Sequence, residues 1–291
     1  MLAAVARSGS ITAAAKNLTY TPSAVSQQIR KLEGELGLSV LSRHAKGVDL
    51  TDAGRAVVKH VGMIERELAA LREELEDIAG VRAGSLRLGA FPTFGASLLP
   101  FAITSFAEEH RGVSLTVRSA HRRGLLDLLH GREIEMAVLW DYEWSRLDQT
   151  GLTVQRLLLD PTELVVSAGH PVAKRRNVAV ADLAQERWIT RADQHPVVEV
   201  LLRTCRTAGF EPTISFEAHD YQEAQAMVAA GLGVALAPRL ALSGVRDDVC
   251  VRHLGDQAPS RRIMLARSAD RALSPAEAAM SRILQQVTHE A

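Results

Sequence analysis

Cysteine is scarce in this chain, with only Cys205 and Cys250 among 291 residues. Two cysteines so far apart are too few for a disulfide framework or for a four-ligand zinc site. A redox-sensing pair is one alternative, but no CxxC spacing and no neighbouring basic cluster supports it. We therefore expect two buried thiols.

Long apolar runs are also missing. No run approaches the roughly 18 residues that a membrane span requires, and residues 2–5 are too brief for the apolar region of a secretory signal. We expect a cytoplasmic protein with no membrane partner. Its composition, 47% apolar and 23% charged, is typical of a folded chain with about two or three domains.

The motifs of enzymes, metal sites and nucleotide sites are missing as well. The sequence has no GxSxG, no HExxH and no cysteine nucleophile site, and its ten histidines show no metal-ligand spacing. Residues 227–235 contain two close glycines but lack the third glycine of a dinucleotide fingerprint and the lysine of a phosphate loop. The sequence predicts no enzyme, no metal and no cofactor.

A net charge of zero conceals an excess of basic residues near the N-terminus. Residues 1–60 contain eight Lys or Arg against four Asp or Glu, residues 61–84 contain three against six, and the remainder contains 23 against 24. The basic segment supplies the charge that contacts with DNA phosphates require. A solvated basic surface is the alternative, and charge alone favours it.

Two helices joined by a turn are predicted in this basic segment. Ser10 is a good N-cap for an alanine-rich helix over residues 11–18, and Tyr20, Thr21 and Pro22 supply a turn, a capping hydroxyl and a first-turn proline for the next helix. Apolar residues recur on that second helix at helical spacing and predict a buried stripe. They are Ala24, Val25, Ile29, Leu32 and Leu36.

Polar side chains occupy the other face of the second helix. Short hydroxyls, an amide and a guanidinium are groups that read base edges and hold phosphates. The predicted DNA-binding residues are Thr21, Ser23, Ser26, Gln27, Arg30 and Lys31, joined by Arg43 and Lys46 of the following hairpin. An ordinary polar helix face is the alternative for this segment taken alone.

A small basic hairpin is predicted after Gly37, where the second helix ends. Residues 39–43 and 48–50 are expected as its strands and residues 44–47 as its tip. Such a wing lies along the DNA backbone, so Arg43 and Lys46 are expected to bind phosphate rather than specify sequence. The segment is therefore predicted to be a winged helix-turn-helix.

A long helix with a regular apolar seam is predicted after Thr51, which is placed to cap it. The seam keeps a period of about 3.5 residues, which favours pairing with a second copy over packing on a globular core. The predicted dimerisation residues are Val57, Val61, Ile64, Leu68, Leu71, Leu75 and Ile78. Packing against the chain's own C-terminal domain is the alternative. Residues 80–84 are expected to form a flexible joint.

One set of N-terminal residues stands in a characteristic order and spacing. They are Ala13, Ala14, Leu18, Ser23, Ala24, Val25, Ser26, Gln28, Ile29, Leu32, Glu33, Leu36, Gly37, Arg43, Leu50, Thr51, Asp52, Ala53 and Gly54. This pattern resembles that of the LysR-type transcriptional regulators, and the rest of the chain fits the same family. The domains expected are a DNA-binding domain at 1–54, a dimerisation helix and hinge at 55–84, and an effector-binding domain at 85–291.

Two departures from the family pattern affect the DNA-binding domain. Members usually carry further residues before the position of Met1, so we expect a short first helix made of residues 2–7. Pro22 stands where the family often has a glutamine that contacts DNA. The resemblance then leaves Ser23, Ser26, Gln27 and Arg30 to share the contacts.

Strands and helices alternate after residue 84. Strands at 85–90, 113–119 and 134–140 with helices at 96–109 and 123–130 favour a parallel sheet. A second set has strands at 162–168, 188–189, 213–216 and 233–237 and helices at 197–209 and 222–230. A strand at 262–267 and a helix at 275–287 are predicted to return to the first set.

The predicted fold class is therefore α/β in two lobes, behind an α-rich winged helix-turn-helix domain. Lobe I is expected at 85–161 and 264–291, and lobe II at 162–263. The chain is expected to pass between the two lobes near Asp160 and near Arg262. Two such crossings predict a cleft between the lobes that closes on a small molecule. The resemblance implies the same, since the family's effector domain looks like a type 2 periplasmic binding protein.

Ligands of open parallel sheets bind beyond the carboxyl ends of the strands. The predicted effector-binding residues there are Thr93, Phe94, Ser97, Trp140, Arg191, His195 and Tyr221. Thr93 and His195 stand at predicted helix starts, which favour anions, and Arg191 adds charge. An N-cap role for Thr93 and ordinary surface loops for His195 and Arg191 are the alternatives.

These features predict a sequence-specific DNA-binding transcription regulator controlled by a small-molecule effector between two lobes. The expected partners are double-stranded DNA, an anionic effector, further copies in a homodimer or homotetramer, and RNA polymerase if the protein activates. A solute-binding protein without a DNA role is the alternative. It explains the C-terminal lobes equally well, but it needs export and leaves the first 84 residues without a purpose.

Overall fold

The computed structural model describes residues 1–44, 47–78, 84–175, 178–192 and 196–290. The chain forms two compact units. The first contains Met1–Gly80 with Gly131–Glu133, and the second contains Val81–His130 with Ile134–Ala291.

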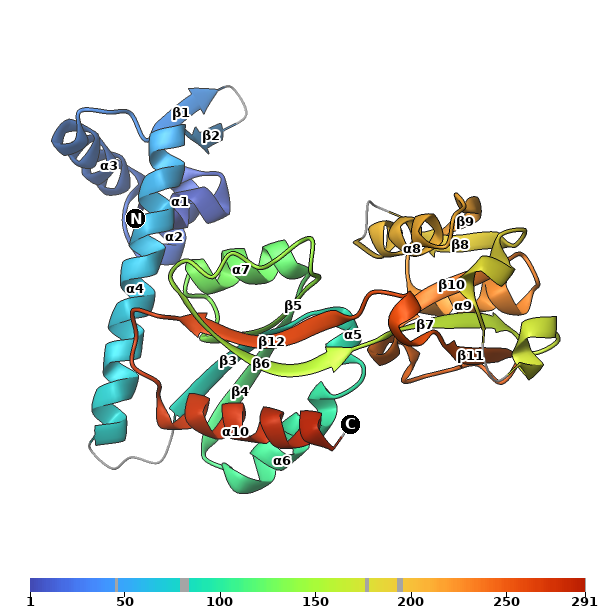
Figure 1. The fold of residues 1–291 in the computed structure, drawn as a ribbon. Coiled ribbons are helices and arrows are strands. Elements are labelled where there is room, and N and C mark those ends of the chain that lie inside the picture. Colours follow the sequence, from blue (N-terminus) through green and yellow to red (C-terminus); the bar gives the residue numbers. More distant parts are fainter. Residues whose placement is uncertain (45–46, 79–83, 176–177, 193–195, 291) are drawn as a thin grey trace. The chain divides into compact units, whose positions relative to one another are not determined.

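Helices and a hairpin form the N-terminal part of the first unit (Figure 1). The helices are α1 (Leu2–Ser8), α2 (Ile11–Leu18) and α3 (Pro22–Leu36), and the hairpin pairs β1 (Leu41–His44) antiparallel with β2 (Gly47–Leu50). Their shared core contains Val5, Ala14, Ala15, Val25, Ile29 and Val40. The predicted winged helix-turn-helix is confirmed.

The predicted helix ends are confirmed by their hydrogen bonds. The Ser10 hydroxyl accepts from the Ala13 N–H at 3.4 Å, and the Thr21 hydroxyl accepts from the Ala24 N–H at 3.2 Å. Gly37 ends α3 with a left-handed φ of 67°. The prediction for Leu36 is wrong: its side chain is 44% exposed, because the last turn of α3 extends beyond the core.

The long helix α4 (Asp52–Ile78) follows the hairpin directly. The Thr51 hydroxyl accepts from the Gly54 N–H at 3.0 Å, which confirms the predicted cap. Gly54 packs so closely on the backbone of Val40 that a Cβ atom there would lie 2.1 Å from the Val40 carbonyl oxygen. Only glycine fits this junction without movement of the neighbouring backbone.

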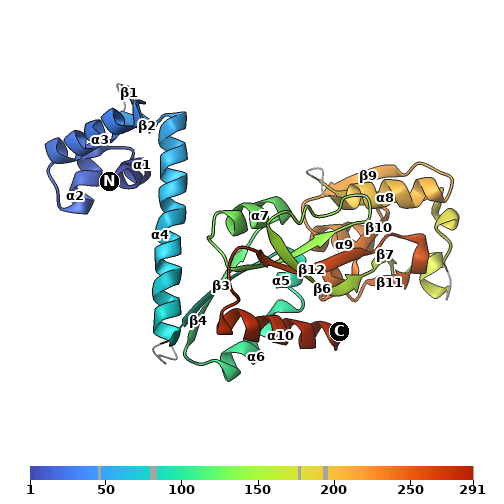
Figure 2. The ribbon, with the colours of Figure 1, turned by 60° about the vertical axis from the view of Figure 1, so that its left-hand side comes forward.

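The second unit consists of two α/β lobes, each built on a five-stranded sheet (Figures 1 and 2). In lobe I the strand order is β4-β3-β5-β12-β6, and Figure 1 shows α7 on one face of the sheet with α6 and α10 on the other. The elements are β3 (Gly84–Ala90), α5 (Pro92–Gly95), α6 (Leu99–Glu109), β4 (Val113–Ser119), α7 (Arg122–His130), β5 (Met136–Asp141), β6 (Leu152–Asp160), β12 (Arg261–Ser268) and α10 (Pro275–His289).

In lobe II the strand order is β11-β7-β10-β8-β9. The strands are β7 (Thr162–Ser167), β8 (Arg187–Arg191), β9 (Thr213–Ala218), β10 (Val234–Pro238) and β11 (Val249–His253), and the helices are α8 (Pro196–Thr207) and α9 (Tyr221–Ala229). Short 3-10 turns complete the lobe: η1 (Pro171–Lys174), η2 (Val180–Leu183), η3 (Arg239–Leu242) and η4 (Gly255–Gln257).

Both sheets are mixed, so the prediction of a parallel first sheet is only partly right. β3 is parallel to β4 and β5, but β12 runs antiparallel to β5 and β6. β12 returns from lobe II without a crossover helix that would fix its direction. It starts in the lobe I sheet at Arg261, before the predicted boundary at residue 264.

The helix predicted over residues 96–109 is α6 in the structure, but it begins three residues later, and a separate short helix, α5, precedes the predicted range. α5 ends at Gly95 and α6 begins at Leu99, with Pro100 in its first turn. Proline lacks the N–H that a continuous helix requires at this point, so a new helix starts here instead.

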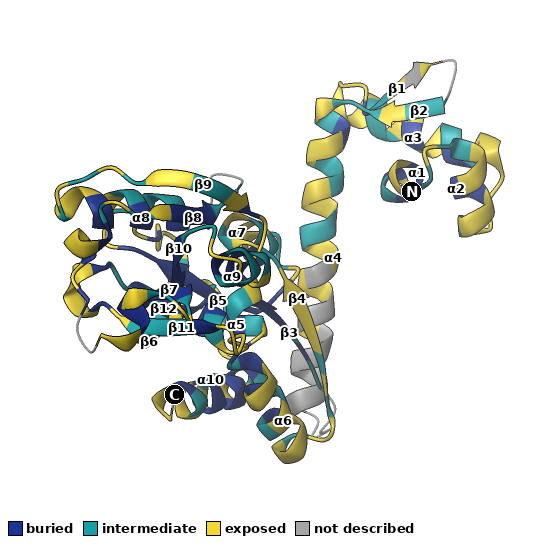
Figure 3. Ribbon diagram, turned by 90° about the vertical axis from the view of Figure 1, so that its right-hand side faces the viewer, coloured by how far each residue is buried: buried dark blue, intermediate teal, exposed yellow. Residues whose placement is uncertain are grey.

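The cores of the lobes lie around the sheets. Figure 3 shows their central strands as buried, and β5 and β10 are buried along their whole length. The largest fully buried side chains include Trp188, Phe94 and Phe106. Across the part of the chain that the structure describes, no helix has both the length and the apolar character that crossing a membrane requires.

Candidate DNA-binding surface and effector site

The polar face of α3 carries the first group of predicted DNA contacts. Ser23, Gln27 and Arg30 are exposed and lie on the helix face opposite the buried residues Val25 and Ile29. Their side chains are therefore accessible to a duplex, as a recognition helix requires.

The other predicted residues of α3, and its N-cap Thr21, already have contacts within the chain. Ser26 is half-buried, and its carbonyl oxygen accepts from Arg30 Nε at 3.4 Å. Lys31 pairs with Glu35 across one exposed turn at 3.9 Å. The Thr21 hydroxyl already caps the helix and lies 3.0 Å from the Ser23 hydroxyl.

The hairpin residues are only partly described. The backbone of Arg43 belongs to β1, where it faces Val48 of β2, but its side chain lies outside the described atoms. Lys46 lies outside the described residues altogether. The predicted phosphate contacts of these two residues stay predictions.

An apolar seam runs along α4, as predicted. Val61, Ile64, Leu68 and Leu71 are 38%, 60%, 54% and 49% exposed, whereas Val57 is half-buried against the core of the first unit. The side chains of Leu75 and Ile78 lie outside the described atoms. Four large apolar side chains in one exposed row are typical of a surface that another helix covers.

In lobe I, the predicted effector residues cluster around α5. Phe94 is fully buried in the core, and the Ser97 hydroxyl donates to the Thr93 carbonyl oxygen at 2.7 Å. The N–H groups of Phe94 and Gly95 donate to the Phe91 carbonyl at 3.1 and 3.0 Å. These donors are used within the helix, which weakens the case that they hold an anion.

The Thr93 side chain instead belongs to a buried charged network. Its hydroxyl accepts from Arg261 Nη2 at 2.8 Å, while Arg261 Nε donates to Asp160 Oδ2 at 2.7 Å. Arg261 and Asp160 are 3% and 1% exposed, and burial raises the pKa of Asp160 above its ordinary value. Asp160 also accepts from the N–H of Leu240 in lobe II at 3.1 Å, so this network joins the lobes.

The predicted residue Trp140 lies beside this network together with Tyr142 and Trp144, two rings that the sequence analysis did not single out. Tyr142 packs edge-on against Trp140, with ring centroids 5.7 Å apart, and stacks on Trp144 at 4.8 Å. Arg122 lies over Trp140 at 5.1 Å. Burial raises the pKa of Tyr142, which keeps its hydroxyl protonated.

In lobe II, Arg191 and Tyr221 lie together as predicted for neighbouring strand ends. The Arg191 guanidinium lies 5.1 Å from the centre of the Tyr221 ring, and its Nε is buried without a hydrogen-bond partner among the described residues. The charge of Arg261 lowers the pKa of both Tyr142 and Tyr221 against a larger effect of burial. A ring from each lobe therefore lies near the same guanidinium. His195 lies outside the described residues.

Four arginine–ring contacts are found within the described ranges, all of them in the two lobes. They pair Arg122 with Trp140, Arg191 with Tyr221, Arg203 with Trp144 and Arg261 with Phe91. We call this set of eight residues the interlobe region. Two of its guanidinium groups already pair with carboxylates, Arg203 with Glu199 and Arg261 with Asp160. Within the same ranges, no group of three or more His, Cys, Asp or Glu side chains is placed to hold a metal ion.

Sequence reasoning missed five residues of the interlobe region: Phe91, Arg122, Trp144, Arg203 and Arg261. Arg261 stands directly before the strand predicted at 262–267, so a charged residue at a predicted crossing was the available signal. No local pattern pointed to Arg122, whose role depends on a ring 18 positions away in the chain.

Two protein-family models match the chain. "Bacterial regulatory helix-turn-helix protein, lysR family" matches residues 1–55, and "LysR substrate binding domain" matches residues 79–288. Among curated relatives, the transcriptional dual regulator GltC of Bacillus subtilis (strain 168) is 30% identical over 217 residues, which cover 74% of this chain and 71% of GltC. A hydrogen peroxide-inducible genes activator of Dickeya chrysanthemi is 30% identical over 267 residues, covering 91% of this chain and 86% of the relative.

Solved structures share the same fold. Full-length CbnR complexed with its target DNA aligns with a TM-score of 0.72 and 19% identity over 98% of this chain and 97% of CbnR. HinK, a LysR family transcriptional regulator from Pseudomonas aeruginosa, aligns with a TM-score of 0.61 and 22% identity over 98% and 96% of the two chains. At these identities the likeness concerns the fold alone.

Proposed function

Because the chain belongs to the LysR family of DNA-binding transcription regulators, which carry an effector-binding domain and are not enzymes, we propose how its parts divide that work. Helix α3 reads DNA, α4 pairs two copies, and the interlobe region binds a small anionic effector. The single observation that carries the DNA-reading role is the exposed polar face of α3 opposite its buried stripe.

A DNA-binding assay tests this proposal directly. The full-length protein is titrated onto labelled duplex from the region beside its own coding sequence, with unrelated duplex of equal length as the control. We expect tighter binding to the first duplex and a steep loss of affinity with added salt, because phosphate contacts release counterions. Equal affinity for both duplexes would contradict sequence-specific reading.

Pairing along α4 gives the DNA-binding units the symmetry of a two-half-site operator. The exposed row of Val61, Ile64, Leu68 and Leu71 supports this arrangement. LysR regulators form oligomers, and we propose a dimer, or a dimer of dimers, for this chain.

An anionic effector is supported by the charge of the interlobe region. Four guanidinium groups lie there. Arg203 and Arg261 pair with Glu199 and Asp160, whereas the buried Nε of Arg191 has no partner among the residues described. A thermal-shift screen of small organic acids identifies candidates. Calorimetry then compares the wild type with Thr93→Val, which removes the hydroxyl that accepts from Arg261 of the interlobe region. We expect weaker effector binding and unchanged DNA affinity. Unaltered effector affinity in the variant would remove Thr93 from the site.

Hydrogen peroxide is a further candidate signal, because one relative is named as a hydrogen peroxide-inducible genes activator. Peroxide sensing requires an accessible thiolate. Cys205 is fully buried, and burial raises the pKa of its thiol to about 12, so the thiol stays protonated near neutral pH. Cys205 therefore does not fit the role of a peroxide sensor, and we propose an organic anion as the effector.

The remaining partners follow from the same proposal. A regulator that activates transcription contacts RNA polymerase at the promoter, and one that binds bacterial DNA works in the cytoplasm. Chemical cross-linking of the DNA-bound protein to RNA polymerase tests the first point.

A further inference from the structure

The turn after β5 in lobe I contacts helix α8 of lobe II through one aromatic side chain. The Trp144 ring centre lies 4.7 Å from the guanidinium carbon of Arg203, and the same indole stacks on Tyr142 with an interplanar angle of 9°. Trp144 follows β5 of lobe I, and Arg203 belongs to α8 of lobe II. The contact therefore joins the two lobes.

The lobe I side of this contact is firmly held. Tyr142 is 2% exposed and forms a β-bridge with Ser145, and Arg122 donates to the Ser145 carbonyl at 3.1 Å and to its hydroxyl at 3.2 Å. The turn that carries Trp144 is thus fixed to its own lobe by hydrogen bonds on both sides of the indole. A change in the Trp144–Arg203 distance requires movement of a lobe rather than of a loose loop.

On the lobe II side, an ion pair holds the Arg203 side chain in place. Arg203 Nε pairs with Glu199 Oε1 at 2.6 Å, one turn earlier on α8. This ion pair restricts the guanidinium to the helix surface that faces Trp144. Neither residue belongs to the chain crossings, which run through Pro161 and into Arg261, so the contact restrains the lobes at a point separate from both crossings.

We propose that Trp144 and Arg203 are positioning residues that hold the two lobes in the arrangement seen here. In the absence of effector, they thereby set the ratio between molecules with this lobe arrangement and molecules with another, and effector binding shifts that ratio. The role in effector response rests on the proposed function, whereas the restraint between lobes does not. A guanidinium–indole contact at a partly exposed site shifts a two-state ratio by about two- to fivefold.

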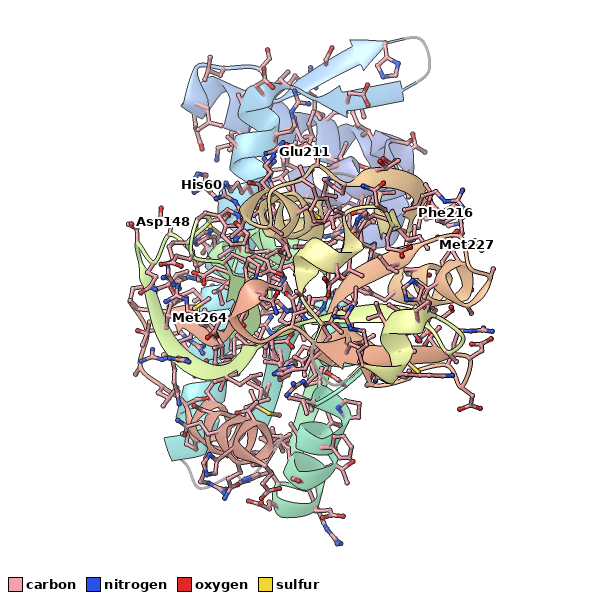
Figure 4. The ribbon with its side chains drawn as sticks, turned by 45° about the vertical axis from the view of Figure 1, so that its right-hand side comes forward. His60, Asp148, Glu211, Phe216, Met227 and Met264 are labelled. Carbon is pink, nitrogen blue, oxygen red and sulfur yellow. The ribbon has the colours of Figure 1, made fainter. Side chains whose placement is uncertain are left out.

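The chain offers a matched control on the same helix. Arg206 lies almost one turn beyond Arg203 and pairs with Glu211 at 2.7 Å, and Glu211 is labelled in Figure 4. Arg203→Met and Arg206→Met each remove one exposed ion pair of α8, but only Arg203 lies over a ring of lobe I. A difference between the two variants therefore reports the interlobe contact rather than helix stability.

Acrylamide quenching of tryptophan fluorescence in the full-length protein measures the effect. Trp140 and Trp188 are 6% and 0% exposed, so a gain in accessibility comes from Trp144. We expect stronger quenching in Arg203→Met, wild-type quenching in Arg206→Met, partial restoration in Arg203→Lys, and no difference between Arg203 variants in a Trp144→Phe background. Equal quenching in Arg203→Met and Arg206→Met would overturn the proposal.

A reporter gene placed behind the chain's own promoter region measures the consequence for regulation. Without added effector, Arg203→Met is expected to change basal transcription by about two- to fivefold, and Arg206→Met to leave it unchanged. Altered quenching with unaltered transcription would overturn the role in effector response. Absence of DNA binding by the wild type would instead contradict the proposed function, and the quenching result would stand separately.

Discussion

Two glutamines follow each other on α3, and only the first lies on the face opposite the buried stripe. Gln27 and Arg30 are exposed on that face. Gln28 is exposed too, but it lies about 100° further round the helix, toward Val25 and Ile29. If Gln27 and Arg30 contact bases, replacing either with Ala weakens specific binding by about 1–3 kcal/mol. Fluorescence anisotropy with labelled operator DNA measures the loss.

Gln28→Ala is the matched control for this prediction, because it removes the same amide one position away. We expect it to keep near wild-type affinity for the operator. An equal loss in Gln27→Ala and Gln28→Ala would show that the reading surface of α3 is placed wrongly.

The thiols differ enough in burial to be told apart chemically. Cys205 is fully buried with a pKa of about 12, whereas Cys250 is half-buried on the edge strand β11. Because the thiolate is the reactive form, iodoacetamide at pH 8 should modify Cys205 in the folded protein far more slowly than in urea. Mass spectrometry of the peptides follows both sites. Rapid native labelling or peroxide oxidation of Cys205 would reopen peroxide as the signal.

At the scale of elements, the junction between the hairpin and α4 depends on one glycine. A methyl group at position 54 would meet the Val40 carbonyl oxygen at 2.1 Å and the Leu50 side chain at 3.1 Å. Gly54→Ala should therefore destabilise the first unit by about 1–3 kcal/mol, since the backbone of Val40 must move. Thermal unfolding measures the effect, with Gly34→Ala as the control because nothing lies within 4 Å of a Cβ there. A melting temperature of Gly54→Ala equal to that of the wild type would contradict this close packing.

The exposed seam of α4 predicts the oligomeric state. Ile64→Gln and Leu68→Gln together replace two seam residues with a good helix former, so α4 remains while its apolar row is interrupted. We expect sedimentation to show dissociation toward the monomer and weaker binding to a two-half-site duplex. Glu65→Gln, an exposed change between the two, should leave the assembly intact. A double variant that still sediments as the wild type would move the interface away from α4.

Local signals predicted those parts of the fold that local interactions determine. The capping side chains of Ser10, Thr21 and Thr51 act within three residues, so the sequence shows the helix starts directly. The exposure of Leu36 and the strands β6 and β11 were missed, because each depends on what packs against these residues in the folded chain. β11 has five residues at the edge of its sheet, which is too little for a periodic pattern to stand out.

At the scale of the whole molecule, the candidate site combines residues that the sequence separates widely. Thr93, Arg191 and Tyr221 could be predicted because each follows a predicted strand, and strand ends of one sheet meet at one edge. Arg261 and Asp160 could not, since their ion pair joins positions 101 residues apart and forms only when β6 and β12 pair in the lobe I sheet. The two crossings were predicted, but not the charged pair that lies beside them.

The Asp160–Arg261 pair predicts how the stability of the second unit depends on pH. Burial raises the pKa of Asp160 above 3.8, so the folded chain binds this proton more tightly than the unfolded chain, and stability falls as pH rises through the raised pKa. Arg261 limits that loss by pairing with the carboxylate. Arg261→Met should therefore cost about 3–5 kcal/mol at pH 8 and clearly less at pH 5.

The double variant Asp160→Asn/Arg261→Met separates charge from packing. It removes both charges, and the Asn side-chain oxygen can still accept from the Leu240 N–H. Urea unfolding at pH 5 and pH 8 should then show little pH dependence in the double variant and a smaller loss at pH 8 than in Arg261→Met, because no charge is left buried without its partner. If Arg261→Met lost the same free energy at both pH values, the pair would act through packing alone, and Asp160 would not need Arg261 to stay ionised between the lobes.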